Sequence, residues 1–211
     1  MKINEIYKSI QGESTYSGLP CVFVRLTYCN LRCSYCDTAY AFYEGHEMSL
    51  EQVIQAIRKY DCSLIEITGG EPLLQKEVYP LMDRLIEEGF SVLLETGGSI
   101  DIGEVHPSVI KIMDLKCPSS GESQKNRYDN IHKLQPHDEI KFVIGNRADY
   151  LWALDTIREH RLAGKYRILF STVFGTLQPN ELANWILEDK LNVRFQLQIH
   201  KYIWNPDKRG V

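Results

Sequence analysis

The sequence contains no long apolar run, and no stretch approaches the roughly 18 apolar residues that a membrane-spanning helix needs. Its first residues, Met1–Ile6, also lack the apolar run of a signal peptide. Basic residues are not in excess, since 24 Lys and Arg stand against 28 Asp and Glu, so a general nucleic-acid binder is not indicated. Linkers, repeats and low-complexity tracts are missing too. We therefore expect one cytoplasmic domain, residues 1–211, that binds neither membranes nor nucleic acids.

Cysteine is unevenly distributed. Three of the six cysteines fall within eight residues, because Cys29, Cys33 and Cys36 have the spacing C-x3-C-x2-C. Clustered cysteines in the reducing cytoplasm are metal ligands more often than disulfides, and soft thiolates favour zinc, copper(I) or iron–sulfur clusters. A closed zinc site takes four protein ligands. Three thiolates without an obvious fourth ligand instead predict a [4Fe–4S] cluster with one open iron. The other cysteines are expected to pack in the core: Cys21, Cys62 and Cys117.

Apolar segments with strand and helix patterns alternate along the chain. We expect strands at Lys2–Ser9, Cys21–Tyr28, Leu64–Thr68, Ser91–Glu95, Val109–Leu115, Glu139–Ile144, Tyr166–Phe170 and Val193–Ile199. We expect helices from the N-cap Ser49 to Lys59, and at Val78–Glu88, Arg147–His160 and Asn180–Glu188. Repeated β-then-α spacing predicts an α/β fold with a parallel sheet. About six βα units are too few for an eight-fold barrel, so we predict a partial, modified (β/α) barrel, with an open doubly wound sheet as the alternative.

The unusual residues follow the strands. They are the cysteine loop, Gly69–Pro72, Glu95–Gly98, Lys116–Pro118, Ser171–Phe174 and His200–Tyr202. Active sites of parallel α/β folds lie at the carboxyl ends of the strands. We therefore expect these loops to converge on one cavity.

The C-x3-C-x2-C loop, with Tyr35 before its last cysteine, resembles that of the radical S-adenosylmethionine (SAM) enzymes, whose fold is a full or partial (β/α) barrel. The resemblance implies that Cys29, Cys33 and Cys36 hold a [4Fe–4S] cluster whose fourth iron binds SAM. The cluster then cleaves SAM to a 5′-deoxyadenosyl radical. Gly70 resembles the family's glycine-rich strand end, where a missing side chain lets backbone groups approach a ligand.

Within these enzymes the chain is similar to the 7-carboxy-7-deazaguanine synthase family. The similarity runs from Glu5 to Pro206 and is most specific in Ser9–Glu13, Cys36–Thr38, Thr68–Pro72 and His200–Tyr202. It implies that 6-carboxy-5,6,7,8-tetrahydropterin loses hydrogen from C6, contracts its ring and releases ammonia, on the way to queuosine or another deazapurine. It also implies an assisting Mg2+, a homodimer and an electron donor such as flavodoxin.

The resemblance assigns roles to single residues. Thr38 would ligate Mg2+ through its hydroxyl, since this hard ion prefers oxygen. The substrate would contact Ile10, Gln11, Gly12, Glu13, Arg25, Thr68, His200 and Pro206. SAM would contact Tyr35, Cys36, Asp37, Gly70, Asp114, Leu115, Lys116, Ser171, Thr172, Val173 and Phe174. The SAM-derived radical would carry out the chemistry, and no protein residue would itself be catalytic.

Two other functions are compatible with parts of the pattern. A glycyl-radical activase is also a small radical enzyme, but Gln11–Glu13 and Thr38 argue against it. A zinc-stabilised binding module without catalysis could use His46 as a fourth ligand, although its spacing fits no motif. For Arg25, which lies within an apolar strand, a salt bridge to a core acid is the alternative to a substrate contact.

Overall fold

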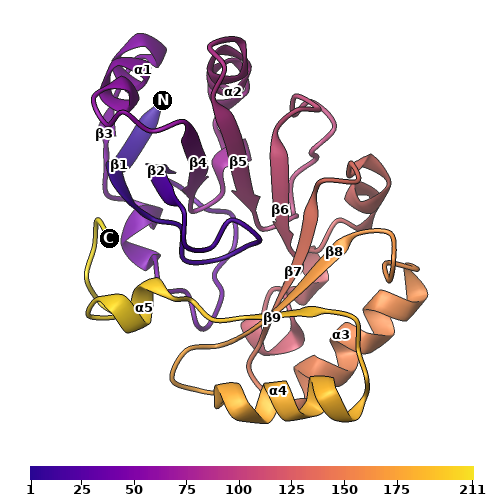
Figure 1. Ribbon diagram of the computed structural model, residues 1–211. Coiled ribbons are helices and arrows are strands. Elements are labelled where there is room, and N and C mark those ends of the chain that lie inside the picture. Colours follow the sequence, from indigo (N-terminus) through magenta and orange to yellow (C-terminus); the bar gives the residue numbers. More distant parts are fainter.

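The polypeptide forms a nine-stranded sheet that is open at both edges. The computed structural model describes all 211 residues, and the strands are ordered β3-β1-β2-β4-β5-β6-β7-β8-β9 (Figure 1). The strands are β1 (Lys2–Ile10), β2 (Pro20–Leu26), β3 (His46–Glu47), β4 (Leu64–Gly69), β5 (Ser91–Thr96), β6 (Ile110–Asp114), β7 (Glu139–Ile144), β8 (Arg167–Thr172) and β9 (Arg194–Gln196). The α-helices are α1 (Leu50–Arg58), α2 (Val78–Glu87), α3 (Arg147–Glu159), α4 (Pro179–Glu188) and α5 (His200–Ile203).

The direction of winding identifies the architecture. Strands β2 and β4 to β9 are parallel to their neighbours in this series, whereas β1 is antiparallel to both β2 and β3. From β2 onward, each parallel strand is added on the same side of the previous one. A doubly wound sheet reverses direction at a switch point, and this sheet does not. The predicted partial (β/α) barrel is therefore confirmed, and the doubly wound alternative is wrong.

The connections between the parallel strands vary. The predicted helices are all present: α1 lies in the β2–β4 connection, after the short strand β3, and α2, α3 and α4 follow β4, β7 and β8, respectively. The β5–β6 connection contains no helix, and the β6–β7 connection contains only short 3-10 helices. The predicted N-cap of α1 is confirmed as a capping box, in which Ser49 Oγ accepts from Gln52 N and Gln52 Oε1 accepts from Ser49 N. None of these helices has the length and apolar character to span a bilayer.

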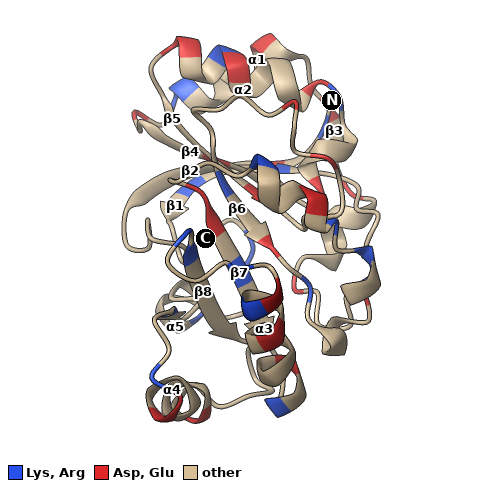
Figure 2. Ribbon diagram, turned by 90° about the vertical axis from the view of Figure 1, so that its right-hand side faces the viewer, with Lys and Arg blue, Asp and Glu red and all other residues tan.

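Alternation along the strands gives the sheet two different faces. The outward face packs against the helices in the main core, which also contains Cys117. The inward face has a smaller apolar cluster near the strand starts: Cys21, Phe23, Leu64, Leu93, Ile112 and Leu169. Two positions further along these strands, the side chains are polar or charged: Arg25, Glu66, Glu95, Asp114 and Ser171. Figure 2 shows both signs of charge on the central strands as well as along the helices.

The isolated cysteines behave as expected. Cys21 and Cys117 are fully buried in the two apolar clusters, and Cys62 packs against both clusters. None of the six cysteines forms a disulfide. Packing therefore explains the three cysteines outside the loop.

Candidate active site

The cysteine loop begins two residues after β2, at Tyr28, whose backbone is in the left-handed conformation. Tyr28 has a φ of 78°, a conformation that costs a non-glycine residue of order 1–3 kcal/mol and is concentrated at functional sites. Tyr28 N donates to Ala41 O at 2.9 Å, and Tyr28 O accepts from Glu71 N at 2.8 Å. The turn is thus bonded on both sides, which offsets the strain and directs the loop across the strand ends.

The middle of the loop is bonded to the segment that follows β6. Ser34 N donates to Ser120 O at 2.9 Å, and Ser34 Oγ donates to Ser119 O at 2.7 Å. Arg32 N donates to Glu122 Oε1 at 2.7 Å. The loop therefore lies over the carboxyl ends of β4, β5 and β6, where the sequence predicted a cavity.

The three thiols of the loop have the chemistry that a cluster needs. Each cysteine is partly exposed and free of a disulfide. Burial raises the pKa of the Cys33 thiol to about 11, Lys116 acts in the opposite direction, and charge on Cys36 or Cys29 would raise the pKa further. The three sulfurs are therefore electrostatic neighbours beside one lysine.

These thiols do not surround a single point. No group of three or more His, Cys, Asp or Glu side chains is arranged to hold one metal ion. In a [4Fe–4S] cluster each thiolate binds a different iron, so the sulfurs need not converge as they do around zinc. The donor set of Cys29, Cys33 and Cys36 therefore fits a three-cysteine cluster.

The Gly-Gly-Glu-Pro segment, Gly69–Pro72, packs against the start of the cysteine loop. A Cβ added to Gly70 would lie 2.7 Å from both Tyr28 C and Cys29 Cβ, and closer still to Tyr28 O. Gly70 thus permits close backbone packing at the base of the loop, and its contact with SAM stays a prediction. The next residue, Glu71, is fully buried and accepts hydrogen bonds from Leu73 N, Thr96 Oγ1 and Gly97 N. It joins the end of β4 to the end of β5.

The predicted substrate segment, Ile10 to Glu13, lies against the inward face and the last helix. Gln11 is 3% exposed, and its Nε2 donates to Glu66 Oε2. Glu13 N donates to Gln11 Oε1 at 3.0 Å. Gly12 O accepts from Ile199 N at 3.1 Å, and a Cβ at Gly12 would overlap the ring of His200. The structure therefore brings Gln11, Glu13 and His200 together from opposite ends of the chain.

Arg25 and Thr68 are neighbours on β2 and β4, where they are paired in register. Arg25 Nε donates to Glu5 Oε1 at 2.8 Å, and Nη2 donates to Tyr7 Oη at 2.9 Å. The salt bridge considered as an alternative is thus present, with Glu5 as the acid. These bonds leave Nη1 to donate elsewhere, so the predicted contact with a substrate carboxylate stays a prediction.

Asp37 and Thr38 lie just beyond the last cysteine. Asp37 Oδ2 accepts from Lys201 Nζ at 2.6 Å, which connects the cysteine loop to α5. Thr38 precedes a short 3-10 helix, but its side chain makes no capping hydrogen bond. Its Oγ1 is 3.8 Å from Cys36 Sγ. The Thr38 hydroxyl is therefore next to the cluster cysteines and not committed to a structural cap.

Two further segments predicted to contact SAM lie at the carboxyl ends of β6 and β8. Lys116 Nζ is 2.9 Å from Asp114 Oδ2, whereas the buried Asp114 Oδ1 has no hydrogen-bond partner. Leu115 is fully buried in the core, so only its backbone could contact a ligand. Ser171, Thr172 and Val173 are buried, and Phe174 is exposed and packs edge-on against Tyr202. The predicted SAM contacts of these segments remain predictions, as do those of Tyr35, whose Oη donates to Val143 O.

The chain end differs from the other predicted segments. Pro206 is exposed, and a hydrogen bond from Lys208 N to Asn205 O spans it. Arg209 Nη1 donates to Glu44 Oε2 at 2.8 Å. These contacts attach the tail near the end of the cysteine loop, and a role for Pro206 in substrate binding remains a prediction.

The sequence patterns did not identify one buried residue of the site, Lys141. Lys141 on β7 is paired with Glu13 at 2.9 Å, with Glu95, and more distantly with Asp114 at 3.7 Å. Arg25 was singled out as a charged residue within an apolar strand. The same criterion applies to Lys141 in the strand Glu139–Ile144 and could have identified it.

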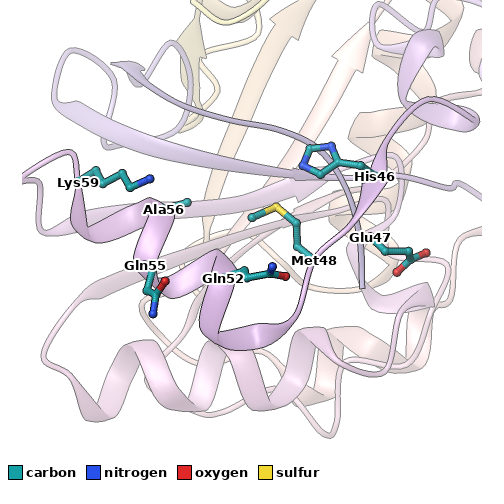
Figure 3. A pocket seen from close by; sticks show the side chains of 7 residues that line it. All are labelled: His46, Glu47, Met48, Gln52, Gln55, Ala56 and Lys59. Carbon is teal, nitrogen blue, oxygen red and sulfur yellow. The ribbon is translucent and has the colours of Figure 1, made fainter.

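A separate pocket of ≈ 320 Å³ lies between β3 and α1 (Figure 3). Its lining includes His46, Met48, Gln52 and Lys59, and none of the predicted site residues. His46 lies there and is exposed.

Comparisons with known proteins agree with this geometry. Residues 24–114 match the family model of the radical SAM superfamily. The 7-carboxy-7-deazaguanine synthase of Koribacter versatilis is 49% identical over 226 aligned positions, which cover all of both chains. The synthase of the same name from Chlorobaculum tepidum is 47% identical and covers all of this chain and 97% of its own.

Solved structures agree on the fold. The crystal structure of QueE from Escherichia coli has a TM-score of 0.77 at 24% identity and covers 92% of each chain. The structure of Streptococcus suis SuiB bound to S-adenosylmethionine has a TM-score of 0.51 at 13% identity, covering 82% of this chain and 48% of that one. With a cysteine loop over the strand ends and full-length identity of nearly one half, the chain belongs to the 7-carboxy-7-deazaguanine synthase family of radical SAM enzymes.

Proposed function

We propose that the chain is a carbon–nitrogen lyase that converts 6-carboxy-5,6,7,8-tetrahydropterin into 7-carboxy-7-deazaguanine with loss of ammonia, in queuosine or deazapurine biosynthesis. The observation that carries this proposal is identity of 49% with a synthase of that name over the whole of both chains, far beyond the cysteine loop. Neither a glycyl-radical activase nor a zinc-stabilised binding module agrees with membership of this family.

Cys29, Cys33 and Cys36 would hold the [4Fe–4S] cluster, as their donor chemistry allows. When bound, the cluster and SAM would supply the 5′-deoxyadenosyl radical needed to remove a hydrogen atom from the substrate. The protein positions both molecules. The close packing at Gly70 and the hydrogen bond from Glu71 N to Tyr28 O fix the loop above the strand ends. The free Oδ1 of Asp114 and the Lys116 ammonium provide an acceptor and a donor beside it.

The pterin would lie on the charged part of the inward face. A pterin ring presents N–H donors and acceptor atoms along one edge, and Gln11 and Glu13 can satisfy such an edge. Although burial alone raises the pKa of Glu13, Lys141 and the hydrogen bond from Gln198 Nε2 lower it to about 2. Glu13 is therefore an ionised acceptor at neutral pH. Arg25 and Thr68 lie on adjacent strands and would contact the substrate from the other side.

Mg2+ would bind through the Thr38 hydroxyl and oxygen atoms of the substrate. The hydroxyl makes no capping bond, and Mg2+ usually keeps few protein ligands.

The assembly and the partners follow from the family resemblance. We infer a homodimer and reduction by a donor such as flavodoxin. We also infer that residues 1–211 are a single catalytic domain, which is supported by the inclusion of every strand in one sheet.

The test is anaerobic turnover. Reconstituted protein with dithionite, SAM, Mg2+ and 6-carboxytetrahydropterin should release 7-carboxy-7-deazaguanine, identified by mass, together with ammonia. A C33A protein treated identically is the control and should form neither deazapurine nor 5′-deoxyadenosine. Formation of 5′-deoxyadenosine without deazapurine would reject the substrate and retain the radical chemistry.

A further inference from the structure

Lys141 connects three acidic side chains that come from different parts of the chain. Its Nζ lies 2.9 Å from Glu13 Oε2, forms an ion pair with Glu95, and is 3.7 Å from Asp114 Oδ2. The Lys141 side chain is 5% exposed. Glu13 belongs to the loop after β1, Glu95 to β5 and Asp114 to β6, so one ammonium group joins the proposed substrate segment to the proposed SAM segment.

Few other groups could replace Lys141 at Glu13. The second lysine of the site, Lys116, is bonded to Asp114. Gln198 Nε2 donates to Glu13 Oε1 at 2.8 Å but has no charge. The other titratable groups that influence Glu13 or lie beside it are Glu66 on β4, Glu95 on β5, His200 on α5, and Asp37. His200 is the only one of them that could be cationic, and burial lowers its pKa.

We propose that Lys141 is a positioning residue for the pterin, which fixes the Glu13 carboxylate so that its remaining lone pairs face the N–H donors of the substrate. The inference rests on the proposed function. A carboxylate can accept about four hydrogen bonds, and Lys141 and Gln198 use one on each oxygen. The lone pairs that remain have directions set by the Lys141 ion pair.

Loss of the lysine charge should affect Glu13 in two ways. Without a nearby counter-charge, a buried carboxylate becomes protonated at higher pH. A protonated Glu13 would direct its O–H donor at the N–H donors of the pterin. The repulsion among Glu13, Glu95 and Asp114 is also no longer offset, so the Glu13 side chain loses its single orientation. Both effects weaken binding of the pterin and leave SAM binding largely unchanged.

The experiment compares K141M with the wild type, both as reconstituted holoenzyme. Equilibrium binding of 6-carboxytetrahydropterin is measured anaerobically without reductant, so that no turnover occurs. The dissociation constant of the pterin should rise about ten-fold or more, the effect expected for loss of one charge-assisted hydrogen bond, while that of SAM changes less than about two-fold. Relative to the wild type, K141M should bind the pterin still more weakly as the pH falls. E13Q/K141M should bind no more weakly than E13Q, and K141R should recover part of the affinity.

The chain offers a matched control in Lys111, the other buried lysine of the sheet. Its side chain is 2% exposed, pairs with Asp138 at 3.1 Å and lies near the start of β6, at the opposite end of the barrel. K111M should lower thermal stability without changing the pterin dissociation constant. If K141M does not fold, K141Q is measured in its place.

The outcomes separate the two proposals. If the wild type does not bind or convert the pterin, the proposed function fails. If the wild type converts it and K141M binds it normally, only the role of Lys141 fails. Equal losses of pterin affinity in K141M and K111M, or failure of both K141M and K141Q to fold while K111M folds, would also overturn the inference, because Lys141 would then be a residue of general stability.

Discussion

Replacement of Gly70 by alanine tests how far the cysteine loop depends on close backbone packing against the end of β4. The added Cβ would lie 2.7 Å from Tyr28 C and from Cys29 Cβ, and Cβ contacts under 3.0 Å are essentially never observed. Tyr28 C is a backbone atom, so rotation of a side chain cannot relieve the overlap. The φ of Gly70 is not in the left-handed region. The effect of G70A should therefore come from the contact alone.

The size of the effect follows from what must move. Overpacking of a close contact costs about 1–3 kcal/mol. Displacement of the loop also weakens the hydrogen bond from Glu71 N to Tyr28 O, which is 2.8 Å long, and a bond of this kind contributes about 0.5–1.5 kcal/mol. The free energy of unfolding should therefore fall by about 2–4 kcal/mol. For a domain of this length, the melting temperature should fall by roughly 5–15 °C.

The assay has two parts, thermal unfolding of the apoprotein and the iron and sulfide content after anaerobic reconstitution. G70A should unfold at a lower temperature and, because Cys29 is displaced, bind markedly less iron. G103A is the matched control, since Gly103 is exposed and an added Cβ would come no closer than 3.0 Å to the movable Asp101 side chain. A G70A protein that matches G103A in both measurements would refute the packing argument.

Three further predictions concern the charged part of the inward face and the cysteine loop. Burial and the charges of Glu95 and Glu13 raise the pKa of Glu66 well above its usual value, so the ionised form is disfavoured in the folded state and stability is lost as pH rises above about 4.5. The melting temperature of E66Q should therefore gain on that of the wild type between pH 5 and pH 8, and a difference that shrinks over this range would contradict a protonated Glu66. C33A should lose the brown colour and SAM cleavage, and an unchanged absorption spectrum would remove Cys33 from the ligand set. T38A should retain the cluster and lose most of the Mg2+ dependence of turnover, and an unaltered Mg2+ response would discredit Thr38 as a ligand.

Local sequence patterns predicted most of the fold. The apolar, β-branched run Cys21–Tyr28 corresponds to β2, and the capping pattern at Ser49 marks the start of α1. The last predicted strand, Val193–Ile199, is only partly correct, because β9 ends at Gln196 and α5 begins at His200. This strand pairs along one side only, so its length depends on tertiary contacts that local propensity does not describe. The short edge strand β3 was missed for the same reason.

The site was predictable where its residues are close in sequence. The spacing of Cys29, Cys33 and Cys36 is a local pattern, whereas the ion pair between Glu13 and Lys141 joins residues 128 positions apart. One criterion, a charged residue within an apolar strand, would have identified more of the charged residues on the inward face. Arg25 was singled out as a charge within an apolar strand, and Glu66, Glu95 and Lys141 meet the same criterion in β4, β5 and β7.

The distribution of charge on the inward face explains why this criterion should work. Residues such as Phe23, Leu93 and Leu169 seal the start of the strands, which excludes water and strengthens every charge interaction above them. Ionised groups in such a place must be paired, since an unpaired buried charge is costly. Lys141 and Lys116 provide that pairing for the acids around them. A substrate that binds to this part of the inward face therefore meets groups whose charge and direction are already set. Discrimination between substrates should depend on this network more than on the cysteine loop, whose pattern is typical of radical SAM enzymes.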